Sequence, residues 1–139
     1  MPLTMPSLLK IGELEAQSGV PIRTLRYYEE LNLIQSRRRT TGGFRLFAPE
    51  VVSRLAFIKR AQYLGFSLQE IGHILTIHDQ GELPCAEVRQ KLQVKVMEIE
   101  NRIAELRVLQ QQLQGLIFDS EPLPHPQEGV ICPILETPL

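Results

Sequence analysis

The sequence predicts a mainly α-helical protein: a small domain of short helices with a β-hairpin, then one long helix and an irregular tail. Three observations predict this. Apolar residues recur at helical spacing in short segments between residues 11 and 78. The 34 residues of 85–118 contain no proline and only one glycine. Five of the ten prolines lie in residues 119–139, which we expect to form a loop with one short turn near Pro133.

Two short helices joined by a glycine-containing turn begin the domain. The first is expected over residues 11–18 and the second from Pro21, whose fixed φ is tolerated at a helix start, to about Glu30. This arrangement is typical of a helix-turn-helix, although any small pair of helices can show it. Their expected buried positions are Ile11, Leu14, Ile22, Leu25 and Tyr28.

Four residues of the second helix project away from its apolar face: Arg23, Thr24, Arg26 and Tyr27. They place hydrogen-bond donors and a planar ring on one side of a helix, a combination suited to a DNA groove.

The next segment, residues 37–47, is basic, contains two adjacent glycines and ends in polar and apolar alternation. It predicts a two-stranded hairpin, or wing. Pro49 begins a third helix that runs to about Leu64. Ser67 and Glu70 have the spacing of a capping box, so a fourth helix is expected from there to about His78.

Charge is distributed unevenly along the chain. The net charge is −1, but residues 22–60 contain nine basic and three acidic residues, a balance of +6. Residues 84–139 contain five basic and eight acidic residues, a balance of −3. The compact basic segment indicates a nucleic-acid footprint, with a solvated basic face as the alternative.

The long helix carries a heptad seam with one polar position. Its residues are Leu92, Val96, Ile99, Ile103, Leu106, Gln110, Leu113 and Ile117. A helix about 50 Å long beside a small domain has no partner of equal length in its own chain. We therefore expect a homodimer; folding back onto the small domain is the weaker alternative because the seam is long and narrow.

The two cysteines flank this helix. Cys85 lies seven residues before Leu92, on the seam, and Cys132 lies in the tail. A parallel dimer would place Cys85 beside its own copy, whereas an antiparallel dimer would bring it to the partner's tail, with His125, Asp119 and Glu121 as further donors. Such a set suits Zn²⁺ first, although the cysteines also fit an apolar position and a buried thiol.

Other classes of protein are excluded or disfavoured. No apolar run reaches the length of a membrane span, and residues 1–9 are too short for a signal peptide, so we expect a cytoplasmic protein. No catalytic triad, phosphate loop or paired-carboxylate pattern indicates an enzyme. A non-DNA interaction module built on the long helix is a further alternative.

Several motifs together resemble the MerR family of transcriptional regulators over about residues 9–135. They are Ile11-Gly12-Glu13, Ser18-Gly19-Val20, Thr24-Leu25-Arg26-Tyr27-Tyr28-Glu29-Glu30, Leu33-Ile34, Gly43-Phe44-Arg45-Leu46-Phe47 and Leu64-Gly65-Phe66-Ser67-Leu68-Gln69-Glu70-Ile71. One departure is Phe47, where the family more often has Tyr; the loss of a hydroxyl contact to phosphate would not abolish DNA binding.

The resemblance implies a winged helix-turn-helix DNA-binding domain (8–80), a hinge and antiparallel coiled-coil dimerisation helix (81–118) and an effector-binding loop and tail (119–139). It also implies a mechanism. The dimer binds a palindromic promoter whose spacer between the polymerase-contacting elements is too long. With effector bound, it bends and underwinds the DNA so that these elements align for RNA polymerase. Arg23, Thr24, Arg26 and Tyr27 match recognition-helix contacts, and the wing contributes Arg38, Arg39, Phe44 and Arg45.

For the effector, Cys85 matches a position where divalent-metal sensors of the family have Cys, and Cys132 matches the ending of the metal loop. The family's other loop cysteine is missing, because Asp119 and Ser120 stand there. His125 is the expected replacement, with Asp119 as a further candidate, which favours Zn²⁺, with Co²⁺, Cd²⁺ or Pb²⁺ next, over Hg²⁺. The chain lacks the four cysteines of iron–sulfur members. A thiol- or aldehyde-sensing regulator using Cys85 or Cys132 is the alternative.

Overall fold

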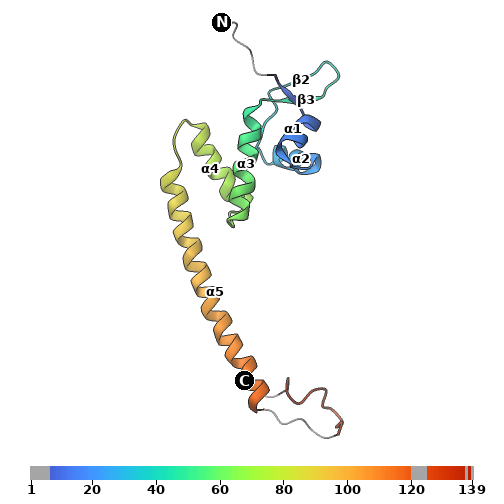
Figure 1. Ribbon diagram of the computed structural model, residues 1–139, viewed down its shortest axis with the longest axis vertical. Helices are drawn as coiled ribbons and strands as arrows, with labels where there is room; N and C mark the ends of the chain where they lie inside the picture. Colours follow the sequence, from blue (N-terminus) through green and yellow to red (C-terminus); the bar gives the residue numbers. More distant parts are fainter. Residues whose placement is uncertain (1–6, 120–124, 137, 139) are drawn as a thin grey trace. The chain divides into compact units, whose positions relative to one another are not determined.

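The computed structural model describes residues 7–119, 125–136 and 138 (Figure 1). In chain order the elements are β1 (Leu9–Lys10), α1 (Ile11–Ser18), α2 (Ile22–Glu30), β2 (Arg38–Arg39), β3 (Arg45–Phe47), α3 (Glu50–Tyr63), α4 (Leu68–Asp79) and α5 (Cys85–Asp119). The predicted mainly helical fold is confirmed. The chain divides into two compact units, Met1–Val88 and Arg89–Leu139, with the boundary inside α5.

The three strands form a small antiparallel sheet in the order β1-β3-β2. The predicted hairpin is present: β2 pairs with β3, and the backbone N–H of Thr40 donates to the carbonyl of Phe44 at 2.7 Å. Gly43 closes the loop with a φ of 84°, which a residue with a Cβ rarely adopts. Strand β1 was not predicted, because two residues are too few to show an alternating pattern, and its pairing with β3 is non-local.

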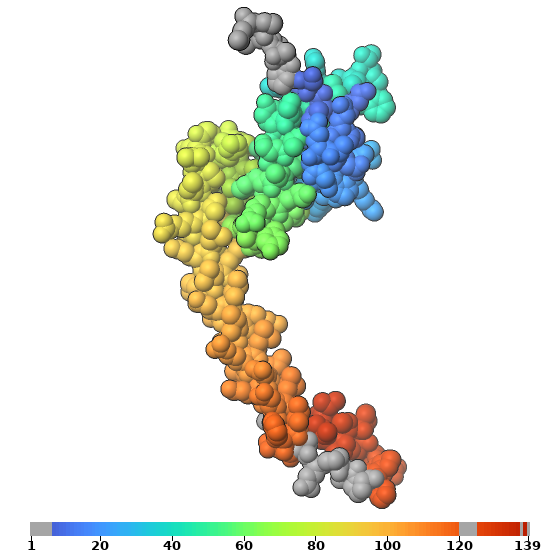
Figure 2. Space-filling model, in the orientation of Figure 1, coloured from blue at the N-terminus to red at the C-terminus, as the bar shows by residue number. Residues whose placement is uncertain are grey.

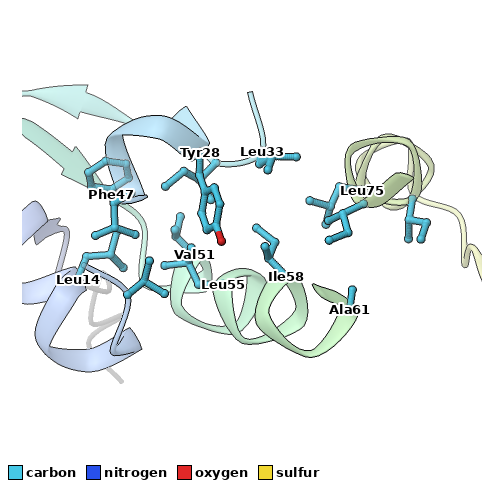
Figure 3. Packing of buried hydrophobic residues seen from close by; sticks show 14 of the residues in the cluster. Leu14, Tyr28, Leu33, Phe47, Val51, Leu55, Ile58, Ala61 and Leu75 are labelled. Carbon is cyan, nitrogen blue, oxygen red and sulfur yellow. The ribbon is translucent and has the colours of Figure 1, made fainter. Parts of the chain in front are cut away.

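Helices α1 to α4 and the sheet enclose one apolar core. Figure 3 shows Tyr28 of α2 among side chains of α3, and the Tyr28 hydroxyl donates to Oε1 of Gln62 at 2.8 Å. Burial raises the pKa of Tyr28, an effect that the bond to Gln62 partly offsets. The buried residues are Leu9, Leu14, Val20, Leu25, Tyr28, Leu33, Ile34, Phe47, Val51, Leu55, Ile58, Ala61, Phe66, Ile71, Ile74 and Leu75.

The ring of Phe47 is wholly buried, with an exposed fraction of 0%. The resemblance implied only that this residue lacks the hydroxyl of the family's usual Tyr. In the structure it packs the end of β3 against Leu14 and other core residues (Figure 3), so the first role of this side chain is to hold the sheet onto the helices.

Polar side chains define several helix ends. The predicted capping box of α4 is confirmed: the N–H of Glu70 donates to Oγ of Ser67 at 3.1 Å, and the N–H of Ser67 donates to Oε1 of Glu70 at 3.0 Å. At the start of α2, the N–H of Ile22 donates to Oε2 of Glu15 at 2.8 Å. Because helix N-termini carry unpaired N–H groups and a partial positive charge, Glu15 stabilises α2 from the preceding helix.

Helix α5 has 35 residues, and none of them is buried. It begins at the predicted residue, Cys85, and ends at Asp119. After it, Cys132 to Glu136 forms the predicted short turn, in which the N–H of Glu136 donates to the carbonyl of Cys132 at 3.1 Å. No helix in the described part of the chain is long and apolar enough to cross a membrane.

Candidate nucleic-acid interface and candidate metal ligands

The outer side of α2 presents the residues that the sequence singled out. Arg23 and Arg26 are exposed, Tyr27 is 49% exposed and Thr24 is half-buried. Leu25 and Tyr28 anchor the opposite side in the core, as the apolar spacing predicted, whereas Ile22 at the first turn is only half-buried. The helix therefore offers two guanidinium groups and one ring to solvent from a rigid base.

The wing presents a second group of candidate contacts. Arg38 and Arg39 of β2 are exposed, and Phe44 at the loop end is 71% exposed. The loop is held in shape because Oγ1 of Thr40 accepts from the N–H of Phe44 at 3.1 Å. Arg45 of β3 is only partly exposed, unlike its neighbours.

Arg45 forms an ion pair with a residue of α2. Its Nε lies 2.7 Å from Oε1 of Glu29, the penultimate residue of α2. The sequence placed Glu29 in a family motif and among the acidic residues of the basic segment, but it indicated no partner for this carboxylate. The two residues are 16 positions apart in different kinds of element, so no local spacing could have paired them.

Three other basic residues of the segment also have partners inside the domain. Arg54 donates to both carboxylate oxygens of Asp79, Lys59 donates to the carbonyl of Ser18 at 3.4 Å, and Arg60 lies over the Tyr63 ring at 5.8 Å. Part of the +6 balance therefore has partners within the domain, whereas five arginines on α2 and around the wing are exposed: Arg23, Arg26, Arg37, Arg38 and Arg39.

A shallow hollow of about 450 Å³ continues the outer surface of α2 toward α4. Tyr27, Leu31 and Leu33 line it on one side, and Leu68, Gln69 and Gly72 on the other. The start of α4 thus lies next to the exposed ring of Tyr27, and the candidate interface consists of the outer side of α2, the wing and the first turn of α4.

The candidate metal ligands lie at the two ends of α5 and in the segment that follows it. Cys85 and Asp119 are the first and last residues of α5 and are exposed. Cys132 is half-buried and His125 is exposed, and both thiols are free. Glu121 lies outside the described residues. Among residues 7–119, 125–136 and 138 of one chain, no three His, Cys, Asp or Glu side chains come together as metal ligands do.

The apolar seam of α5 is uncovered. Its apolar residues are between 40% and 69% exposed, and the polar Gln110 is exposed as well. Figure 2 draws this helix in yellow to orange. Contiguous apolar surface of this kind is unusual on a monomer and marks an interaction site. The exposed fractions are Leu92 40%, Val96 54%, Ile99 59%, Ile103 44%, Leu106 48%, Leu113 50% and Ile117 69%.

Comparison with known families agrees with this geometry. A model described as MerR HTH family regulatory protein matches residues 9–76, and one described as MerR, DNA binding matches residues 52–116. Curated relatives match nearly the full length at more than 35% identity. The chain belongs to the MerR family. Members of this family are transcriptional regulators and not enzymes, and the helix-turn-helix matched here is their DNA-binding part.

Three relatives show the extent of the likeness. This MerR-family chain is 39% identical over 130 residues to the HTH-type transcriptional regulator ZntR of Escherichia coli (strain K12), covering 93% of this chain and 91% of the relative. It is 38% identical over 128 residues to the mercuric resistance operon regulatory protein of Bacillus cereus, covering 92% and 95%. The crystal structure of PbrR691 from Ralstonia metallidurans CH34 in complex with lead(II) matches with a TM-score of 0.75 and 30% identity, covering 91% and 96%.

Proposed function

We propose that this MerR-family protein is a metal-responsive transcriptional regulator that binds promoter DNA as a homodimer. DNA binding is supported by five exposed arginines on α2 and around the wing. The core of the same domain is apolar. Arg23, Thr24, Arg26 and Tyr27 would contact base edges and phosphates from α2. Arg38, Arg39, Phe44 and Arg45 would contact the backbone from the wing.

The homodimer is supported by the uncovered seam of α5. Seven apolar seam residues at least 40% exposed would lose much of that exposure against a second α5. Burial of such side chains is the main favourable term in association, at about 25 cal/mol for each Å² of apolar surface. Two copies related by a two-fold axis would also present two recognition helices to a palindromic site. We expect the two α5 helices to run antiparallel.

The metal response is carried by one observation: Cys85 begins the uncovered helix, Cys132 lies in the segment that follows it, both thiols are free, and one chain does not assemble a ligand set from its described residues. In an antiparallel dimer, Cys85 of one protomer would meet Cys132, His125 and Asp119 of the partner subunit. Two thiolates with an imidazole or a carboxylate suit Zn²⁺, with Co²⁺, Cd²⁺ and Pb²⁺ as further candidates. The relatives named for mercuric resistance and crystallised with lead(II) support a metal effector.

Such a site would link the start of α5 in one protomer to the 119–136 segment of its partner, so a bound divalent cation supplies a cross-link between the protomers. Because α5 continues directly from the hinge after α4, the cross-link can alter how the DNA-binding domains are held. We propose that the dimer then distorts the promoter so that RNA polymerase can initiate, which makes the protein an activator.

Anaerobic titration of the reduced protein with Co²⁺ tests the site directly. We expect thiolate-to-metal charge-transfer bands and intense d–d bands of tetrahedral cobalt, with about two ions for each dimer. Cys85→Ser and Cys132→Ser should each abolish the charge-transfer bands at that site. His125→Ala should weaken binding, whereas His73→Ala, which removes an exposed histidine of α4, should leave it unchanged.

An alternative function is suggested by the exposure of the Cys85 thiol. A thiol or aldehyde sensor would use Cys85 or Cys132 as a nucleophile and would activate transcription without metal. The response of Cys132→Ser separates the two functions. If this variant keeps its full transcriptional response to Zn²⁺, the metal site proposed here is wrong and the thiol sensor is favoured.

A further inference from the structure

The ion pair between Glu29 and Arg45 connects the two parts of the candidate DNA interface. Glu29 lies in the last turn of α2, and Arg45 begins β3 of the wing. Nε of Arg45 lies 2.7 Å from Oε1 of Glu29, and the two side chains are 38% and 18% exposed. Neither the sequence motifs nor the basic balance of the segment assigns a role to Glu29.

The strand register explains why a carboxylate is needed at this place. Arg39 and Arg45 are directly opposite each other in the β2–β3 pair, so their side chains project from the same face of the sheet. Arg45 also shares its face with Phe47, which is buried in the core, so this face is directed toward the helices. Like charges directly opposite each other destabilise a strand pair, and the carboxylate of Glu29 offsets that repulsion.

The pair leaves the outer end of the guanidinium available. Arginine has five N–H donors, and in the ion pair with Glu29 its Nε is the nitrogen closest to the carboxylate. In the described part of the chain, no hydrogen bond is made by the two terminal nitrogens of Arg45. These four N–H groups can donate to a phosphate in the planar, forked geometry that arginine offers.

The other carboxylate oxygen of Glu29 has no donor that competes with Arg45 among the described residues. Oε2 is buried and has no hydrogen-bond partner among the described residues. A buried carboxylate oxygen without a donor is unfavourable. It is also inaccessible, so Glu29 does not read a base through this atom. The ion pair that the structure gives the Glu29 carboxylate is the one with Arg45.

We propose that Glu29 is a positioning residue for DNA recognition. It holds the guanidinium of Arg45 so that its terminal N–H groups donate to a DNA phosphate, and it thereby couples the wing to the recognition helix. This role concerns DNA binding and does not depend on the metal response proposed above.

The neighbouring Glu30 provides a matched control because it is an exposed carboxylate on the same turn of α2. Removing either negative charge reduces repulsion from the DNA backbone, so electrostatics alone predicts that Glu29→Gln and Glu30→Gln both tighten binding. A positioning role predicts opposite signs: Glu30→Gln binds equally or more tightly, and Glu29→Gln binds more weakly by about tenfold, as for a lost charged hydrogen bond.

The experiment measures dissociation constants for a duplex that the wild-type protein itself selects from a randomised DNA pool. It compares wild type, Glu29→Gln, Glu30→Gln, Arg45→Ala and the double variant Glu29→Gln/Arg45→Ala. We expect the double variant to bind like Arg45→Ala alone, because Glu29 acts through Arg45. In a phosphate-ethylation interference experiment, the signal at one phosphate should disappear for both Glu29→Gln and Arg45→Ala. A general weakening of the fold would instead reduce the signal at many phosphates.

Arg45→Lys keeps the proposal testable if Glu29→Gln does not fold. Lysine preserves the charge but lacks the fork, so we expect a loss of affinity similar to that of Glu29→Gln. The proposal is overturned if Glu29→Gln tightens binding as Glu30→Gln does, if the effects of Glu29→Gln and Arg45→Ala add, or if Arg45→Lys binds as tightly as wild type.

Discussion

The guanidinium of Arg54 donates to both carboxylate oxygens of Asp79, at 2.7 and 3.0 Å, while its Nε donates to the carbonyl of Leu33 at 2.6 Å. One side chain of α3 thus joins the last residue of α4 to the turn that follows α2. An acidic residue at a helix C-terminus is unfavourable because of the helix dipole. The bidentate pair offsets that cost, and together with the bond from Nε it connects the end of α4, where the hinge to α5 begins, to the turn that follows α2.

This pair predicts a pH-dependent contribution to stability. Arg54 lowers the pKa of Asp79 by donating to its carboxylate, an effect that burial of the group partly opposes. A lowered folded-state pKa stabilises the protein above the ordinary carboxyl pKa of about 4, and this contribution is lost as pH falls through the lowered value. Because Asp79 is half exposed, we expect Asp79→Asn to reduce the free energy of unfolding by only about 0.5–1 kcal/mol near pH 7.

Urea unfolding of wild type and Asp79→Asn at about pH 7 and about pH 3 measures this contribution. The gap between the two proteins should shrink at the lower pH, whereas Glu82→Gln, which alters another exposed carboxylate close in sequence, should match wild type at both. An equal gap at both pH values would show that the pair does not act through the charge of Asp79.

Phe44 and Phe47 are three residues apart on the wing but differ in environment: Phe44 is 71% exposed and Phe47 is 0% exposed. Phe47→Ala should reduce the free energy of unfolding by about 3–5 kcal/mol, because it removes a ring from a packed core. Phe44→Ala should leave the melting temperature unchanged and weaken DNA binding. Differential scanning calorimetry with DNA-binding measurements checks both. A large loss of stability in Phe44→Ala would contradict the assignment of this ring to the interface.

Ile103 and Val108 of α5 have similar exposure, 44% and 54%, but only Ile103 lies on the seam. Ile103→Lys should weaken the dimer by about 10- to 100-fold, because an isoleucine side chain would no longer be buried against the partner. Val108→Lys should leave the dimer intact. Sedimentation equilibrium over a dilution series measures the dimer dissociation constant of each variant. Equal dissociation of the two variants would mean that the seam is not the interface.

Much of the DNA-binding domain follows from local signals. The Ser67 and Glu70 capping box, Pro21 at the start of α2 and the glycines of the wing each act over a few residues, so the sequence pattern located them correctly. Strand β1 was missed because its only support is pairing with residues far along the chain.

In the basic segment, too, local features were predicted correctly and contacts between distant residues were not. Spacing on α2 correctly predicted that Arg23, Arg26 and Tyr27 are directed away from the core. The balance of +6 did not show that Arg54 and Arg45 are paired, because Asp79 and Glu29 come from other elements. Charge counting along a chain cannot distinguish a side chain directed at a carboxylate from one directed at solvent.

The order of residues was sufficient to establish which segments are helical, that α5 carries an unpartnered apolar seam and that two cysteines flank it, since periodicity, caps and breakers act over a few residues. Packing alone decided that Phe47 belongs to the core, that Glu29 meets Arg45 and that Arg54 joins α4 to the turn after α2. Contacts between residues distant in sequence depend on how elements dock, and that geometry comes from burial of the whole core and not from any local pattern.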